Sequence, residues 1–241
     1  MANFETHFKV ATLASAIISG TLLATHTIEP NHAVLAFGFG ILGGILPDID
    51  SSNSKPITIA FNLISLFLSI IAVFIKADVY SVAEMIIMAG GIFMIIRYGL
   101  IEVFRKFVIH RGMFHSIPTA TLWGVIVAII MHYLFDYDEL VSWIYGLMTT
   151  LGYLVHLTLD EFYSVDLYNR RMKKSFGTAL KFFMLDKPQD KLYTISIYLA
   201  LFMLISIAPD YHFFVDSIFS EEALKNFQTV LLPSDGKWFS K

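Results

Sequence analysis

The chain has 241 residues, of which 56% are hydrophobic and only 15% are charged, and its net charge is −3. A soluble domain carries about 25% charged residues, so this composition argues against a soluble globular protein. Cysteine is absent, which excludes disulfides and thiolate metal sites.

The apolar residues are grouped in long, nearly charge-free segments, and most of these approach the roughly 20 residues that a helix needs to cross a bilayer. In chain order they are Val10–Ile28, Ala33–Leu46, Ile57–Ile75, Val79–Ile96, Ile117–Phe135, Leu140–Leu159 and Leu192–Ala208. We therefore predict an all-α, polytopic transmembrane helix bundle of about seven spans over residues 1–208, followed by a tail over residues 209–241.

The second segment is the weakest of the seven, because it is short and contains Gly38, Gly40, Gly43 and Gly44. Two interpretations are open. The segment could be tilted, broken or re-entrant, or its glycines could let neighbouring helices approach closely.

Basic residues predict the orientation of the bundle. Segments 97–116 and 160–191 are rich in Lys and Arg, whereas the turn between them, residues 136–139, has none. By the positive-inside rule the two basic segments are cytoplasmic, and counting spans outward places the N-terminus inside as well. Four polar stretches then lie at one depth, at the cytoplasmic surface: "HFKV", "LPDIDSSNS", "HRGMFHS" and "HLTLDEF".

These stretches supply an inner cluster of seven candidate metal ligands. Asp48 and Asp50 would point the same way if their turn is extended, because strand-like side chains alternate. His156 and Asp160 are four residues apart, so they share one face of a helix. The members of the inner cluster are His7, Asp48, Asp50, His110, His115, His156 and Asp160.

"HRGMFHS" carries further polar groups. Ser116 is placed to cap the following helix, with Pro118 in its first turn. Arg111 could hold a phosphate or carboxylate in bidentate fashion, or could be only a topology signal. We expect Asp50 and Arg111 to act in catalysis.

An outer cluster competes with the inner one, and spacing alone cannot choose between them. His132 and Asp136 repeat the four-residue spacing at the opposite end of the bundle. The remaining members of this outer cluster are His26, Glu29, His32 and His212.

Imidazole and carboxylate ligands predict one or two divalent metal ions, with zinc first and manganese or iron as alternatives. Such ions activate water, so hydrolysis is the natural chemistry. We expect a phosphoester or other ester of a lipid or lipid-linked substrate, membrane lipids as partners, and no nucleic acid. The alternatives are a transporter for a divalent cation and a non-enzymatic membrane protein.

Three stretches, "GILGGILPDIDSSNS", "HRGMFHS" and "GYLVHLTLDEF", resemble in sequence and order the blocks of the LexA-regulated, membrane-bound predicted metal-dependent hydrolases of bacteria. The resemblance covers about residues 1–165. It implies a multi-pass enzyme of the bacterial inner membrane. It also implies that the metal ligands belong to the inner cluster, with His7 matching the family's N-terminal histidine.

Two segments fall outside the resemblance. The basic loop 160–191 either only sets the topology or also presents lipid phosphates to the site. In the tail, Ser220 precedes an amphipathic helical pattern, which predicts a helix lying on the membrane or on the bundle.

Overall fold

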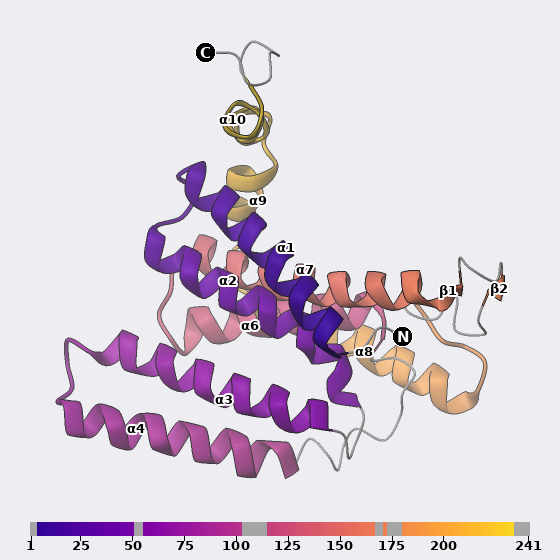
Figure 1. Ribbon diagram of the computed structural model, residues 1–241, viewed down its shortest axis with the longest axis horizontal. Helices are drawn as coiled ribbons and strands as arrows, with labels where there is room; N and C mark the ends of the chain where they lie inside the picture. Colours follow the sequence, from indigo (N-terminus) through magenta and orange to yellow (C-terminus); the bar gives the residue numbers. More distant parts are fainter. Residues whose placement is uncertain (1–3, 51–54, 103–114, 167–170, 173–179, 234–241) are drawn as a thin grey trace.

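The structure is a computed structural model that describes residues 4–50, 55–102, 115–166, 171–172 and 180–233. It is built almost entirely of helices (Figure 1). The helices are α1 (Phe4–Ala24), α2 (Pro30–Ile45), the 3₁₀ helix η1 (Leu46–Asp50), α3 (Lys55–Lys76), α4 (Val82–Met94), the π-helical turn η2 (Ile95–Leu100), α6 (Ile117–Tyr133), α7 (Glu139–Ser164), α8 (Pro188–Ile207), α9 (His212–Phe219) and α10 (Glu221–Leu231). Two two-residue strands, β1 (Val165–Asp166) and β2 (Arg171–Met172), form an antiparallel pair.

The all-α membrane bundle predicted from hydropathy is confirmed. Five helical segments within the described residues are long and apolar enough to cross a membrane, and the apolar stretches Phe61–Ile75 and Ile117–Tyr133 are shorter. Each of the seven predicted segments corresponds to one of these helices. The fourth span extends beyond its predicted end, because η2 continues the helix from Met94 to Leu100.

The second segment is a continuous helix, so of the two interpretations left open, that of a broken segment is wrong. Helix α2 packs between α1 and α7. A Cβ atom on Gly43 would collide with the carbonyl oxygen of Thr149, and one on Gly152 would collide with that of Gly40. The glycines therefore let the backbones of α2 and α7 touch, which is the close approach that small residues permit between membrane helices.

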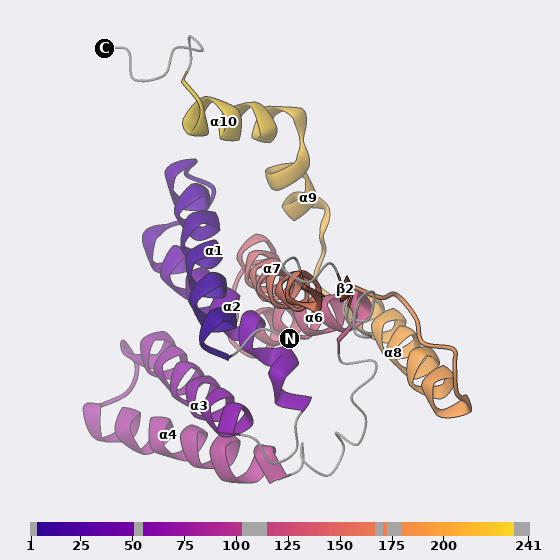
Figure 2. The same ribbon diagram turned by 45° about the vertical axis from the view of Figure 1, so that its right-hand side comes forward.

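The helices outside the packed group of α1, α2, α6 and α7 are less buried. Helices α3 and α4 run side by side along one edge of the molecule in both views, and α8 packs against α6 (Figures 1 and 2). Helices α9 and α10 lead away from the bundle, although α9 contacts α7 and α10 contacts α1. Only 6% of the span formed by α4 and η2 and 11% of the α8 span is buried, which suits surfaces that face lipid.

The topology places four helix ends together. Helices α1 and α2 are antiparallel neighbours, as are α6 and α7, and α2 packs on α7. The start of α1, the end of α2, the start of α6 and the end of α7 therefore lie at one end of the bundle. Which side of the membrane this end faces stays a prediction from the basic residues.

Serine side chains cap the N-termini of two helices, α6 at this end of the bundle and α10 in the tail. The Ser116 side chain accepts a hydrogen bond from the Thr119 amide at 3.4 Å, which confirms the predicted cap of α6. Ser220 caps α10 in the same way, through the Ala223 amide at 3.2 Å.

Candidate metal centre

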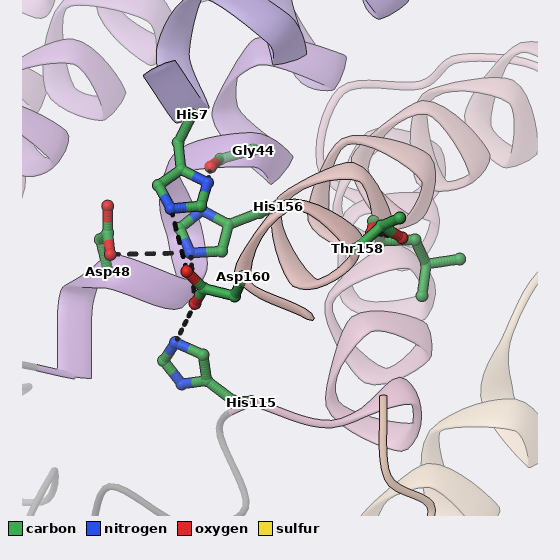
Figure 3. A network of polar contacts seen from close by, with 8 residues as sticks. His7, Gly44, Asp48, His115, His156, Thr158 and Asp160 are labelled. Carbon is green, nitrogen blue, oxygen red and sulfur yellow. Dashed lines mark hydrogen bonds and ion pairs between the residues drawn. The ribbon is translucent and has the colours of Figure 1, made fainter. Parts of the chain in front are cut away.

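Five side chains of the inner cluster meet at this end of the bundle (Figure 3). His7 comes from the first turn of α1, Asp48 from η1, His115 from the residues before α6, and His156 and Asp160 from the last turns of α7. His110, Arg111 and the side chain of Asp50 lie outside the described residues.

The backbone of the turn after α2 differs from the extended conformation that was expected. Residues 46–50 are not extended but form a 3₁₀ helix, because Leu46 keeps helical angles (φ −53°, ψ −40°) and the chain winds on from α2. With three residues per turn, side chains two apart point to different sides. The alternation expected to align Asp48 with Asp50 therefore does not apply.

Asp160 lies at the centre of the group. Its Oδ1 is 3.2 Å from His7 Nε2. Its Oδ2 is 3.6 Å from His156 Nε2 and 3.6 Å from His115 Nε2. The ligand atoms offered by His7, His156 and Asp160 all lie within 4.8 Å of one another. One carboxylate thus faces three imidazoles from three separate segments.

The orientation of His156 is set by the backbone of α2. Its Nδ1 lies 2.8 Å from the carbonyl oxygen of Gly44, and a carbonyl can only accept a hydrogen bond. Nδ1 therefore carries a proton and donates it to Gly44. Metal-binding histidines are held in this way, with one ring nitrogen bonded to a carbonyl and the other left for the metal.

The other nitrogen of His156 faces two carboxylates. Nε2 is 3.6 Å from Asp48 Oδ1 and 3.6 Å from Asp160 Oδ2, and it is buried without a hydrogen bond to any described residue. In the neutral ring this nitrogen carries a lone pair, which two carboxylate oxygens would repel. The arrangement calls for a positive charge between them, supplied by a proton or by a metal ion.

The distances bear on which of these two charges could lie there. A separation of 3.6 Å exceeds the 2.7–3.2 Å of an N–H···O hydrogen bond. Two ligands on one tetrahedral zinc, each bonded at about 2.1 Å, lie about 3.4 Å apart. These two separations are therefore compatible with a divalent cation, whereas the 3.2 Å between His7 Nε2 and Asp160 Oδ1 also suits a hydrogen bond.

Most side chains of this group are buried, which affects their charge. His7, His156 and Asp160 are at most 5% exposed, whereas the Asp48 side chain is 26% exposed. Burial, and then the nearby charge of His156, lower the pKa of His115 to about 4. The His115 ring is therefore neutral near pH 7, which is the form of imidazole that binds metals.

The outer cluster does not gather in the same way. His32 Nδ1 lies 2.8 Å from the Tyr145 hydroxyl, and His132 Nδ1 lies 2.9 Å from the Tyr137 carbonyl oxygen. His212 pairs with Asp210 at the exposed start of α9. Within the described residues, no group of three metal-binding side chains forms at that end.

Lys181, from the basic loop for which two roles were left open, lies in the site region. Its carbonyl accepts a hydrogen bond from the Ile117 amide at 3.1 Å, which holds the basic loop against the start of α6. Its positive charge acts on His115 and lowers the pKa of that ring further. The density of basic residues in the loop was the available signal, but it did not single out one lysine.

Residues 1–168 match the model of the YdjM inner membrane protein family. The chain belongs to this family. The match covers all four segments that meet at the centre and ends shortly after α7. The protein is therefore a multi-pass protein of the bacterial inner membrane, as the resemblance implied. No curated protein and no solved structure matches the chain.

Proposed function

We propose that this member of the YdjM family is an integral-membrane, metal-dependent hydrolase that cleaves a phosphoester or other ester of a lipid or amphiphilic substrate. The observation that carries the proposal is the buried Nε2 of His156, which faces two carboxylates at 3.6 Å while Gly44 holds the opposite nitrogen. A divalent cation between His156 Nε2 and the two carboxylates would supply the positive charge that these groups call for.

The residues that would hold the metal are His7, His156 and Asp160, with His115 and Asp48 beside them. Mixed imidazole and carboxylate ligands suit zinc, with manganese or iron as alternatives. The two oxygens of Asp160 face different histidines, which is compatible with either one or two ions. A bound divalent ion would lower the pKa of water and polarise the ester bond.

The protein's own groups would divide the remaining tasks. The Asp48 carboxylate is the most exposed of the five side chains, so substrate and water would enter on its side. Asp48 is therefore our candidate to accept the proton of the attacking water. Lys181, which is held beside the start of α6, would attract an anionic headgroup.

The position of the centre favours amphiphilic substrates. All five side chains lie at the ends of apolar helices, where the bilayer meets water. A headgroup could reach this depth by lateral diffusion while its acyl chains stay in the membrane. Water-soluble esters would have no such advantage.

Metal content and hydrolysis should be measured together on the purified, full-length protein. Elemental analysis would compare the wild type with His156→Ala and Asp160→Asn. His212→Ala is the matched control, because its ring is 75% exposed and lies on α9. Bis(p-nitrophenyl) phosphate and p-nitrophenyl butyrate would serve as the phosphoester and carboxylic ester probes.

We expect bound metal in the wild type and the control, its loss in both site variants, and metal-dependent hydrolysis of at least one probe by the metal-loaded proteins. Wild-type metal content in both site variants would overturn the metal centre. Metal binding that the site variants lose, without hydrolysis of either probe or of extracted membrane lipids, would overturn the hydrolase assignment.

A further inference from the structure

A cavity of about 530 Å³ lies between the α3–α4 pair and α6. Side chains from α2, η2 and α7 complete its walls. Thr149 is the single polar residue among the described residues that line it. The volume is within the range of ordinary ligand sites, but such sites carry several polar groups that orient a ligand. This cavity therefore suits a ligand segment that has no polar atoms.

The cavity is elongated along the helices. On α6 its lining extends from Trp123 to Met131, which corresponds to about 12 Å of helix, and it continues onto Leu134 and Phe135 after the helix ends. An acyl chain spans one leaflet, which is about half of the roughly 30 Å hydrocarbon core of a bilayer. The length of the cavity is therefore comparable with that of one extended acyl chain.

The cavity is open towards the membrane. Among its lining residues, Ile130 is 38% exposed, Leu100 is 48% exposed and Leu134 is 70% exposed. Leu100 and Ile130 belong to apolar helical segments and Leu134 directly follows one, so the medium outside the opening would be lipid. An acyl chain could enter sideways from the bilayer.

One end of the cavity lies near the candidate metal centre along the chain. Leu46 lines the cavity and begins η1, and Asp48 follows two residues later in the same short helix. Asp48 in turn faces His156 Nε2 at 3.6 Å. A lipid whose chain occupied the cavity would therefore have its headgroup at the same end of the bundle as these two side chains.

We propose that the cavity binds one acyl chain of a membrane lipid, and that the headgroup of this lipid lies at the metal centre. The binding of the acyl chain is inferred from the cavity alone. The placement of the headgroup, and hence the assignment of an acyl lipid as the substrate class, rests on the proposed function.

Photo-crosslinking tests the chain-binding step. The full-length protein would be placed in nanodiscs of phosphatidylethanolamine and phosphatidylglycerol that contain a small fraction of phosphatidylglycerol with a diazirine in its acyl chain. After irradiation, mass spectrometry would map the labelled residues. We expect saturable labelling concentrated on the cavity residues of α6 and α3.

Two substitutions provide the comparison. Ile130→Trp places a large side chain at the opening of the cavity and should remove most of this labelling. Leu13→Trp is the matched control, because Leu13 is 62% exposed on α1 and does not line the cavity. If Ile130→Trp fails to fold, the labelling map of the wild type still decides.

Labelling spread evenly over the exposed faces of α1, α4 and α8, and unchanged in a folded Ile130→Trp protein, would show ordinary surrounding lipid and overturn the acyl-chain site. The metal centre is tested separately by Asp160→Asn, which should lose metal but keep the labelling. Saturable labelling in a wild type that binds no metal would overturn the proposed function and the headgroup placement, and would leave the chain site intact.

Discussion

The imidazole rings of His7 and His156 lie face to face, with their centroids 3.6 Å apart and their planes within 9° of parallel. His7 is in the first turn of α1 and His156 is near the end of α7, so this stack joins the two ends of the family-matched region. The stack therefore places both rings beside one carboxylate, that of Asp160, which each ring approaches with its Nε2.

We predict that His7 binds the metal directly. His7→Ala should lower the metal affinity by more than the roughly 10–100-fold that is typical when a group supporting a ligand is removed. His7 lies 3.2 Å from Asp160 and is only 2% exposed, so its removal takes a buried imidazole away from this carboxylate. Competition with a fluorescent zinc chelator would measure the affinity. An affinity equal to that of His212→Ala would mean that His7 is not a ligand.

Metal removal should destabilise the folded protein. A ligand present at 100 times its dissociation constant stabilises the folded state by about 2.7 kcal/mol. EDTA should therefore lower the unfolding temperature of the wild type in detergent, and added zinc should restore it. Asp160→Asn, which lacks the central carboxylate, should show neither change. An equal response of wild type and variant to EDTA would argue against metal binding at Asp160.

The contact between α2 and α7 should tolerate no side chain at Gly43. Gly43→Ala would push a methyl group against the carbonyl oxygen of Thr149, and overpacking of this kind costs about 1–3 kcal/mol. Gly91→Ala on α4 is the control, because no described atom lies within 4 Å of its added Cβ. Thermal unfolding followed by circular dichroism would show a lower midpoint for Gly43→Ala only. Equal midpoints would mean that the two helices are farther apart.

The cap of α6 should matter for the metal centre as well as for stability. Ser116→Ala removes the hydrogen bond to the Thr119 amide, which costs about 1 kcal/mol, and loosens the residue next to His115. We expect a modest loss of metal affinity together with the loss of stability. Ser220→Ala removes the equivalent cap of α10, far from the site, and should leave metal affinity unchanged. Ser116→Thr, which keeps the hydroxyl, should restore both properties.

Hydropathy predicted the spans well because the bilayer requires each one to be apolar over nearly its whole length. The same patterns could not locate α9, which is only eight residues long and buries just Phe214 and Ile218. They also could not choose between a broken helix and a closely packed one for Ala33–Leu46. That choice depended on the helices beside it, because the glycines of α2 make room for Ser15 and Ala11 of α1, Phe67 of α3 and Thr149 of α7.

The sequence by itself determined the membrane class, the approximate spans, the cap at Ser116 and the set of polar stretches that could share one depth. Only the tertiary structure decided that His7, Asp48, His115, His156 and Asp160 meet, and that the outer cluster does not. The physical reason is that depth is a property of each helix, whereas lateral position depends on which helices pack together. The position of Lys181 could not be predicted from the sequence either. The hydrogen bond from the Ile117 amide to its carbonyl, which brings it beside His115, has no local signal in the chain.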